Sequence, residues 1–340
     1  MRPPLDPMLA HLERDIPEGP GWRYEPKWDG FRAIAFLANG DVEVSSRDGR
    51  DLQRYFPELP ALLRQSLPPE CVVDGEVIVA IAGRLEFDAL LQRIHPAASR
   101  VARLSAETPA SFVAFDLLAE GGRDMLDAPF DERRRRLGEL LAGGPEAGRG
   151  SRPLGSAPPE ILLTAQTDDA SEARRWFDEL EPFGLDGIVA KRDDQPYRPG
   201  ERTMVKVKHE RVADCVVGGY RRAKSGDGVG SLLLGLYDQA GVLHYVGFTS
   251  SFRAAQRREV LERLRPLEGG TSFGGGRTPG GPSRWSSGRD TSWIPVEPRL
   301  VCEVRYDHLQ GDRFRHGTTF LRWRPDKPAE ACGFDQVGRT

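Results

Sequence analysis

The stretch EPKWDGFR, residues 25–32, carries most of the information about the fold of this chain. Lys27 is followed, after one residue, by Asp29-Gly30, and strand-like sequence lies on both sides. This pattern predicts a tight turn with Lys27 at its entry. We expect Gly30 to supply the positive φ that such a turn can require. On this stretch alone, an ordinary hairpin with a surface lysine remains an alternative.

The side chains of this stretch also suggest chemistry. A lysine attacks an electrophile only when its amine is neutral, so a nucleophilic Lys27 needs a pKa below the usual value of about 10.4. A neighbouring cation, a metal ion or burial can lower it. Arg32 could place a fixed positive charge beside phosphate groups. The stretch is therefore compatible with covalent catalysis on a phosphate.

Short apolar runs alternate with helical patterns over the first 210 residues. Strands are predicted at 31–37, 42–46, 71–81, 112–118, 160–166, 187–191 and 203–208. Helices are predicted at 86–95, 131–141 and 170–180, with Asp131 and Asp169 as N-caps. Neighbouring strands with hairpin-like spacing indicate an α+β domain with antiparallel sheets. Residues 46–66 can be placed only loosely.

A second domain is expected after Glu210, which divides the chain into residues 1–209 and 210–340. Strands are predicted at 213–220, 231–237, 243–248, 300–308 and 318–323, and a helix at 252–264. About five strands and one helix fit a small OB-fold β-barrel. Residues 268–290, rich in Gly, Ser and Pro, have the composition of a loop.

Composition indicates a soluble globular protein, with 39% hydrophobic and 29% charged residues. No run approaches the roughly 18 apolar residues that a membrane span needs, and the N-terminus has no signal-peptide pattern. The four cysteines lie far apart without a CxxC pair. This argues against a disulfide framework and a structural zinc site and favours reduced, buried thiols in a cytoplasmic protein.

The net charge of −3 hides an asymmetry along the chain. Residues 1–190 hold 22 Lys and Arg against 33 Asp and Glu, whereas residues 191–340 hold 26 against 18. A basic C-terminal half invites a polyanionic partner, although a solvated basic face is an equally good explanation.

Further polar motifs follow other predicted strands. Arg47, in Ser46-Arg47-Asp48-Gly49, is placed to hold a phosphate. Glu76, in Asp74-Gly75-Glu76-Val77, lies in a strand, where a buried carboxylate needs a partner such as a ribose hydroxyl or a metal. Phe115 could stack on a base.

Two strand segments near the end of the first domain carry lysines. Asp186 and Lys191 are separated by an odd spacing, so a regular strand would turn them to opposite faces unless a bulge intervenes. Lys206 and Lys208 share one face, which doubles the positive charge there, although alternating lysines are also common on exposed strands.

Taken in order, these motifs resemble those of the covalent nucleotidyltransferases, a superfamily of ATP-dependent DNA ligases, RNA ligases and mRNA capping enzymes. The resemblance covers nearly the whole chain and continues into Arg322-Trp323-Arg324-Pro325-Asp326-Lys327, which is similar to the RxDK motif that ends the OB-fold. The chain is most similar to the small bacterial ATP-dependent ligases of the ligase C type and to the ligase domain of ligase D.

The resemblance assigns a role to each residue around the nucleoside. Lys27 would be the adenylated nucleophile. Glu25 would lie beside the adenine and Phe115 would stack on it. Glu76 would bind the ribose, and Lys191 would belong to the same nucleotide-binding set.

Other residues are assigned to the phosphates. Arg32 and Arg47 would contact the nucleotide or the 5′-phosphate of the nick. The α-phosphate would be held and its charge neutralised by Arg202, Lys206 and Lys208.

The remaining roles concern the metal and the leaving group. Asp186, with Glu76, would bind a metal, and Arg324, Asp326 and Lys327 would orient the departing pyrophosphate. Two positions depart from the family pattern. Asp186 replaces the usual Glu, which weakens the case for direct metal contact, and Met204-Val205 stand where a Trp is frequent.

The resemblance implies an ATP-dependent DNA ligase that seals nicks with 5′-phosphate and 3′-hydroxyl ends through a lysyl-AMP intermediate. The cofactors would be ATP and Mg²⁺ or Mn²⁺, which prefer oxygen ligands. We expect a monomer whose partners are nicked double-stranded DNA and repair proteins. A DNA-repair role is expected because the sequence shows no helical DNA-binding, polymerase or nuclease domain.

Three alternatives remain at this point. An RNA ligase or capping enzyme would use the same motifs, and the choice between sugars depends on 2′-hydroxyl contacts that sequence does not show. An NAD-dependent ligase would need a nicotinamide-binding region before Lys27 and usually a four-cysteine zinc module. A non-catalytic nucleic-acid-binding module would have no use for the combination of Lys27, Glu76 and Lys206.

Overall fold

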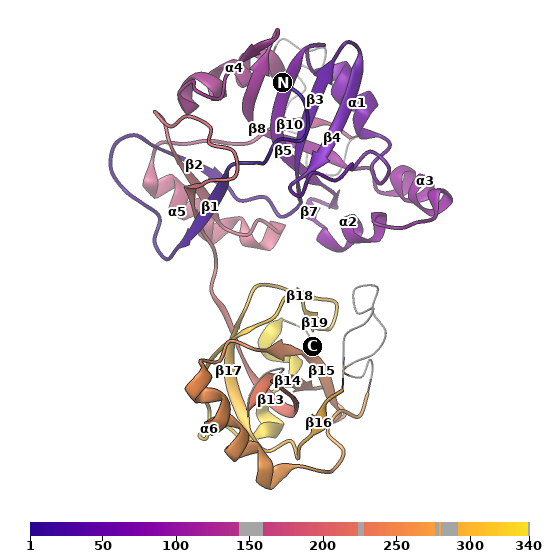
Figure 1. Cartoon of the computed structure of the whole chain (residues 1–340), viewed down its shortest axis with the longest axis vertical. Helices are drawn as coiled ribbons and strands as arrows, with labels where there is room; N and C mark the ends of the chain where they lie inside the picture. Colours follow the sequence, from indigo (N-terminus) through magenta and orange to yellow (C-terminus); the bar gives the residue numbers. More distant parts are fainter. Residues whose placement is uncertain (143–158, 224–227, 276–278, 280–291, 339–340) are drawn as a thin grey trace. The chain divides into compact units, whose positions relative to one another are not determined.

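The computed structural model describes the chain except for residues 143–158, 224–227, 276–278, 280–291 and 339–340. The chain forms two compact units, Met1–His209 and Glu210–Thr340 (Figure 1). Each unit has its own hydrophobic core, so each is described by itself.

A six-stranded sheet forms the larger part of the first unit. Its main order is β10-β8-β5-β3-β4, and β9 pairs with β8. The pairs are antiparallel except for the parallel pair of β10 and β8. The strands are β3 (Phe31–Ala38), β4 (Asp41–Ser46), β5 (Cys71–Ile78), β8 (Ser111–Glu120), β9 (Arg123–Asp124) and β10 (Ile161–Leu163).

Strand β3 shows why this sheet is apolar on both faces. Ala33, Ala35 and Leu37 belong to one buried cluster, whereas Ile34 and Phe36 belong to another. Alternate residues point to opposite faces, so a strand that is covered on both sides must be apolar throughout.

A second, four-stranded sheet has the order β1-β12-β11-β2. Strand β1 runs parallel to β12, and the other pairs are antiparallel. The strands are β1 (Leu9–Glu13), β2 (Trp22–Pro26), β11 (Ile188–Arg192) and β12 (Arg202–Val207). A buried cluster that joins Met8 and Met204 to Ile34 and Phe36 lies between the two sheets.

Helices cover the outer faces of the sheets. Leu59 and Leu63 of α1 (Leu59–Ser66) enter the core of the larger sheet, as does Leu137 of α4 (Phe130–Ala142). Helix α5 (Ala170–Glu179) packs on β2, and Asp169 caps it by accepting the amide hydrogen of Ser171. The shorter elements are α2 (Phe87–Arg93), α3 (Ala98–Glu107), η1 (Glu181–Phe183), β6 (Ala80–Ile81) and β7 (Arg84–Leu85).

The second unit is built on five strands in the order β15-β14-β13-β17-β20. A parallel bridge between Thr249 and Thr318 links the end of β15 to the residue before β20, the two outer strands of this order. Helix α6 (Ala254–Leu264) lies between β15 and β17 in the chain. The strands are β13 (Arg211–Arg222), β14 (Val229–Tyr237), β15 (Leu243–Thr249), β17 (Val301–Tyr306) and β20 (Thr319–Trp323). This connectivity is that of an OB-fold barrel.

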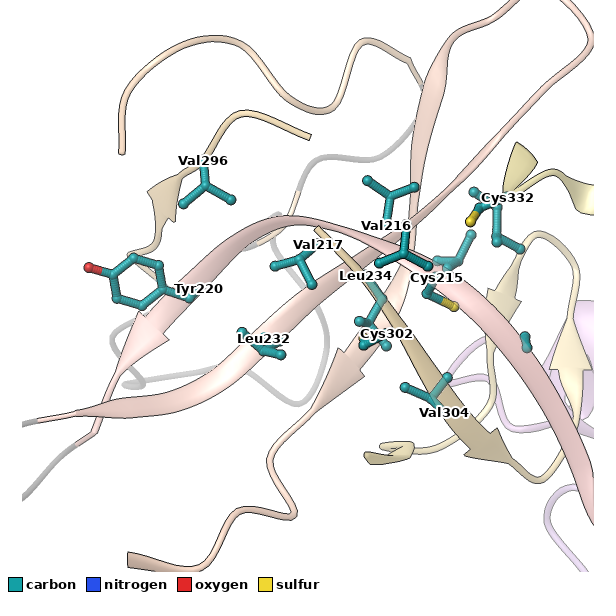
Figure 2. Packing of buried hydrophobic residues seen from close by; sticks show 14 of the residues in the cluster. Cys215, Val216, Val217, Tyr220, Leu232, Leu234, Val296, Cys302, Val304 and Cys332 are labelled. Atoms are coloured by element: carbon teal, nitrogen blue, oxygen red, sulfur yellow. The ribbon is translucent and has the colours of Figure 1, made fainter. Parts of the chain in front are cut away.

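Short elements complete the second unit. They are β16 (Ile294–Pro295), β18 (Leu309–Gln310), β19 (Arg313–Phe314), η2 (Arg265–Leu267), η3 (Ala329–Ala331) and η4 (Phe334–Val337). Figure 2 shows the core of this unit, with Tyr220 toward one end and Cys215, Cys302 and Cys332 toward the other. These thiols and Cys71 are free and buried, as expected. Burial raises the pKa of Cys332 to about 11, so this thiol is protonated at neutral pH.

The α+β class and the OB-fold are thus confirmed, with several local corrections. Helix α4 begins at Phe130, so Asp131 lies inside its first turn and is not its N-cap. The long strand expected at 71–81 is interrupted, because β5 ends at Ile78 and β6 starts a small hairpin. Most of the loop expected at 268–290 lies outside the described residues. Among those described, no helix has the length and apolar composition that a membrane span requires.

Candidate active site

A pocket of about 260 Å³ lies in the first unit and is lined by residues of both sheets. It brings together most of the site residues predicted from sequence in this unit. Those that line it are Glu25, Lys27, Arg32, Arg47, Glu76, Phe115, Lys191, Lys206 and Lys208. The residues come from segments far apart in the chain, so the fold assembles the site.

Lys27 lies where the chain crosses from one sheet to the other. Strand β2 ends at Pro26 in the four-stranded sheet, and β3 begins at Phe31 in the six-stranded sheet, so the segment is not a hairpin turn. The Lys27 amide donates to the Gly187 carbonyl at 2.8 Å, and the Lys27 carbonyl accepts from the Asp186 amide at 2.9 Å. The backbone of the candidate nucleophile is therefore held on both sides by one neighbouring segment.

The Lys27 side chain points into the pocket and is 18% exposed. Its Nζ donates to Oδ2 of Asp186 at 3.0 Å, and Asp186 is 1% exposed. Nζ of Lys208 lies 2.7 Å from the same oxygen. One buried carboxylate thus sets the positions of two amines.

Gly30 is needed at this crossing, but not for the reason predicted. Its φ lies outside the left-handed region, so the expectation of a positive φ is wrong. A Cβ at Gly30 would lie 2.3 Å from the carbonyl oxygen of Val77, far inside van der Waals contact. The glycine lets the chain pass close to β5.

Gly187 decides how Asp186 and Lys191 are oriented. It has φ +132°, and a Cβ there would lie 2.0 Å from the Val207 carbonyl oxygen. Asp186 lies before β11, so its side chain does not follow the alternation of side chains along that strand. Asp186 contacts Lys27, and Lys191 lines the pocket. The odd spacing therefore does not prevent Asp186 from contacting Lys27, which lines the same pocket as Lys191.

The end of the pocket beside Lys27 is rich in cations. Lys206 and Lys208 both line it, one at the end of β12 and one just after it. Burial lowers the pKa of Lys206, and the nearby charges of Lys208, Lys27, Arg202 and Arg47 lower it further. The potential around Lys206 is therefore positive, which favours a bound anion such as phosphate.

The other end of the pocket combines apolar walls with a carboxylate. Phe115, Val189 and Met204 form walls, and the Arg32 guanidinium carbon lies 4.4 Å from the centre of the Phe115 ring. Glu25 is 3% exposed and forms an ion pair with Lys191 at 2.8 Å. Such an end fits a flat heteroaromatic ring that has hydrogen-bond donors.

Glu76 lies directly opposite Arg32 across the β3–β5 pair. Burial raises the pKa of Glu76 to about 7, although the charges of Arg32 and Lys27 oppose the increase. Its carboxylate lines the pocket and fits a ribose hydroxyl or a hard divalent cation. Asp186 fits a metal less well, because its Oδ2 already accepts from Lys27 and lies beside Lys208.

Arg32 is held by residues that sequence reasoning had not singled out. Asp74, which is fully buried, accepts from Nε and Nη2 of Arg32 at 2.6 Å each. The Tyr197 hydroxyl donates to Asp74 at 2.6 Å and accepts from the Met8 amide at 2.9 Å. Asp74 lies within the quoted motif at residues 74–77 and could have been found there. Tyr197 gives no such signal, because it is isolated in a polar loop.

Two predicted phosphate ligands are less central. Arg202 does not line the pocket; its Nη1 donates to the Ala10 carbonyl at 3.3 Å. Arg47 lines the pocket but is 67% exposed. Residues 7–10 also form part of the wall and were missed, because β1 has no apolar alternation that would predict a strand.

The RxDK-like residues gather in the second unit around Asp214. Nη1 of Arg324 donates to both carboxylate oxygens of Asp214 at 2.9 Å, and Nζ of Lys327 donates to Oδ2 at 2.9 Å. Asp326 accepts from Nε and Nη2 of Arg324. Asp214 was not predicted as a site residue.

Comparisons with known proteins agree with this architecture. Residues 7–208 match the model of the ATP dependent DNA ligase domain, and residues 225–327 match that of the ATP dependent DNA ligase C terminal region. The chain is 48% identical over 347 residues to DNA ligase C1 of Mycolicibacterium smegmatis, covering 99% of this chain and 94% of that protein. It is also 48% identical over 351 residues to DNA ligase C of Mycobacterium tuberculosis, with the same coverage.

Solved structures give the same result for the fold. The structure described as mycobacterial DNA ligase D complexed with ATP and MES aligns with a TM-score of 0.50 and 29% identity, covering 96% of this chain and 97% of that chain. A Lig E DNA ligase aligns with a TM-score of 0.57 at 18% identity, covering 93% and 99%, which supports the fold alone.

The fold is that of a nucleotidyltransferase, with an adenylation domain followed by an OB-fold. Within that class, the chain belongs to the ATP-dependent DNA ligases. It is an enzyme that uses ATP and acts on DNA. This confirms the family predicted from sequence and removes the RNA ligase, the capping enzyme, the NAD-dependent ligase and the non-catalytic module as alternatives.

Proposed function

We propose that this ligase seals nicks in duplex DNA through an AMP group carried on Nζ of Lys27. The observation that carries the proposal is that Lys27 lines one pocket together with the cations Lys206 and Lys208 and with the Phe115 ring and the Glu25 carboxylate. An ATP molecule has the matching order of groups, with a base, a ribose and then phosphates. The charged and aromatic groups of the pocket lining therefore match the groups of the substrate.

The nucleoside would occupy the apolar end. Phe115 would stack on the adenine, and Glu25 would accept from its amino group while Lys191 keeps that carboxylate in place. Glu76 would bind the ribose. Its ionised form, favoured above the pKa of about 7, is the better acceptor for a hydroxyl.

The phosphates would occupy the cationic end, and the chemistry proceeds in three steps. Nζ of Lys27, once neutral, attacks the α-phosphorus, and the bond to pyrophosphate breaks. The 5′-phosphate of the nick then attacks the same phosphorus and breaks its bond to nitrogen. Finally the 3′-hydroxyl attacks the activated 5′-phosphorus, and AMP leaves.

Each step builds negative charge on phosphate oxygens, so positioning and cationic groups supply the catalysis. Lys206 and Lys208 would stabilise the α-phosphate, aided by Arg202 from outside the pocket lining, and Arg32 and Arg47 would contact the nucleotide or the 5′-phosphate of the nick. Arg324, Asp326 and Lys327 would orient the pyrophosphate. Asp186 would keep Nζ of Lys27 directed into the pocket.

A divalent cation, Mg²⁺ or Mn²⁺, would supply further charge neutralisation. Glu76 is the better placed oxygen ligand. Asp186 would bind the metal only if its contacts to Lys27 and Lys208 were exchanged. A metal ion would compete with Lys27 and Lys208 for the carboxylate of Asp186. The metal requirement can therefore be measured by following enzyme–AMP formation as the concentration of Mg²⁺ or Mn²⁺ is raised.

The wider setting of the reaction forms part of the same proposal. The excess of basic residues after residue 190 suits binding to DNA backbone phosphates, which carry no sequence information. A relative with 31% identity over 333 residues, from Mycobacterium bovis, is described as a multifunctional non-homologous end joining protein, and this chain covers 39% of it. We therefore propose a monomeric cytoplasmic enzyme that acts on nicked duplex DNA in repair, with repair proteins as partners.

The proposal is tested by incubating the enzyme with ATP labelled at its α-phosphate, together with Mg²⁺ or Mn²⁺. Wild type should become labelled and should seal a nick with a 5′-phosphate but not one with a 5′-hydroxyl. Lys27→Ala should lose both activities while keeping its fold by circular dichroism. The matched control is Arg103→Ala, an exposed position on α3. Labelling of Lys27→Ala at the wild-type level would refute the role of Lys27.

A further inference from the structure

Asp214 in β13 joins two cations of the RxDK-like motif. Its carboxylate accepts from Nη1 of Arg324 and from Nζ of Lys327, all at 2.9 Å, and its side chain is 12% exposed. Two cations that share one carboxylate oxygen lie close enough to repel each other. The carboxylate between them offsets this repulsion and holds them side by side.

The orientation of Arg324 is fixed at both ends of its guanidinium. Nη1 faces Asp214, and Nε and Nη2 face Asp326 at 2.9 and 2.8 Å. Hydrogen bonds between a guanidinium and carboxylates are strong and directional. Lys327 remains able to bind a further anion, because an ammonium has three N–H donors and Asp214 accepts one of them.

Asp214 is itself held by Gln336. The Asp214 amide donates to Oε1 of Gln336 at 2.9 Å, and Nε2 of Gln336 donates to the Asp214 carbonyl at 2.9 Å. The Gln336 side chain therefore pairs with both the amide and the carbonyl of Asp214, as the backbone of a neighbouring strand would. It lies in η4, beyond residue 327, where the match to the family model ends.

The segment that carries Gln336 is anchored in the core of the second unit. Ala329 and Cys332 are buried, and the Tyr237 amide donates to the Cys332 carbonyl at 2.8 Å. Nε2 of Gln336 also donates to the Gly333 carbonyl at 3.1 Å. The position of Asp214 is thus set by the core and not by the exposed surface.

We propose that Asp214 is a positioning residue that keeps Arg324 and Lys327 together as a preformed clamp for the departing pyrophosphate, with Gln336 fixing Asp214. The inference depends on the role proposed above for Arg324 and Lys327. Long basic side chains lose much rotamer freedom when they bind, so a pair that is already ordered loses less. The benefit should be specific to the step in which pyrophosphate leaves.

The test compares two reactions of one preparation of the full-length chain. The first is formation of enzyme–AMP from ATP, and the second is sealing of a nick whose 5′-end is already adenylated, which involves no pyrophosphate. Asp214→Asn keeps the size of the side chain and removes its charge. We expect the first reaction to slow by about 10- to 100-fold, as when a group that orients a functional side chain is removed. The second should change little.

Two further variants and a matched control sharpen the result. Asp214→Glu should recover part of the lost rate, and Gln336→Ala should give a smaller loss in the same reaction, which keeps the test available if Asp214→Asn does not fold. The control is Glu297→Gln, which removes a half-exposed carboxylate of the same unit that pairs with Arg299 at 2.7 Å. It should leave both reactions near the wild-type rate.

The outcomes separate this inference from the proposed function. Asp214→Asn with a normal rate from ATP, with a faster rate, or with equal losses in both reactions would overturn the positioning role. If Arg324→Ala and Lys327→Ala leave enzyme–AMP formation unchanged, the clamp itself is wrong. If wild type forms no adduct, the proposed function fails first. A selective loss for Asp214→Asn with normal rates for Glu297→Gln supports the inference.

Discussion

The two cationic clusters of the molecule, one in the pocket of the first unit and one around Asp214 in the second, differ in how their charges are balanced. In the pocket, burial and neighbouring cations lower the pKa of Lys206. Around Asp214, hydrogen bonding to Arg324 is the main cause that lowers the pKa of Asp326 to about 2, and that of Arg324 is raised. Protonated Lys206 is thus disfavoured by its surroundings, whereas the charges around Asp214 are stabilised by theirs.

The difference indicates which cluster needs its ligand. An anion in the pocket would relieve the unfavourable interactions around Lys206, so binding energy is available there. The cluster around Asp214 is already satisfied by carboxylates and gains less from a phosphate. Its contribution is therefore one of geometry. The following predictions can break or refine this comparison.

The largest effect is expected from Asp186→Asn. Oδ2 of Asp186 accepts from Nζ of Lys27 and lies beside Nζ of Lys208, so loss of its charge leaves two amines without their common anchor. We expect the single-turnover rate of enzyme–AMP formation to fall by about 100-fold, the cost of misplacing a reacting group by about 1 Å. Quench-flow labelling with ATP measures it.

A buried carboxylate outside the pocket provides the control. Asp116 forms a buried ion pair with Arg133, with Nε of Arg133 at 2.7 Å, and neither residue lines the pocket. Asp116→Asn should lower the free energy of unfolding by about 3 kcal/mol. Its rate of adenylation per folded molecule should stay normal. Equal rates for Asp186→Asn and wild type would contradict the anchoring role.

The next effect concerns Glu76 and pH. Its pKa is raised from 4.5 to about 7 by burial, so the folded protein binds more protons than the unfolded chain between these values. The free energy of unfolding therefore falls as pH rises through this window. Glu76→Gln should remove this loss and stabilise the protein by about 1 to 3 kcal/mol at about pH 8, with less effect at about pH 5. Urea unfolding at both values measures it.

The outcome for Glu76 also bears on ATP. Glu76→Gln should weaken ATP binding above about pH 7, where the wild-type carboxylate is ionised. A variant that is no more stable than wild type at high pH would show that Glu76 is not strained in the free enzyme. The charged form of Glu76 would then not be disfavoured in the pocket, and this part of the comparison with the cluster around Asp214 would be wrong.

The smallest effects should have opposite signs in the two clusters. Lys206→Met removes a cation from a repulsive setting and should raise the stability of the free protein by less than about 1 kcal/mol. Lys327→Met removes a partner of Asp214 and should lower stability by about 1 kcal/mol. Calorimetry without ATP measures both. Shifts of the same sign would contradict the comparison.

The architecture was largely predictable from the sequence because most strands carry their own signal. β3, β5 and β8 are rich in buried apolar residues, and their expected positions agree with the structure to within a few residues. β1 could not be found in this way. Its five residues do not alternate between apolar and polar, and its partner β12 lies far along the chain, so the strand depends on a tertiary contact.

The candidate site was predictable as a set of residues but not as a geometry. The motif order identified nine of the residues that line the pocket, and their individual roles remain predictions. The reason for Gly30 was wrong, because the close approach to the Val77 carbonyl arises only when the start of β3 pairs with β5, which lies far along the chain. Tyr197 and Gln336 act through hydrogen bonds to residues more than 100 positions away, which no local pattern reveals.

The central claim is tested most directly by locating the AMP group on the protein. The pocket contains three lysines besides Lys191, namely Lys27, Lys206 and Lys208, and each could in principle carry the adduct. The enzyme is incubated with ATP and Mg²⁺ or Mn²⁺, digested, and analysed by tandem mass spectrometry. We predict AMP on Nζ of Lys27, released when nicked DNA is added. AMP on Lys206 or Lys208 instead, or an adduct that nicked DNA does not discharge, would contradict the account.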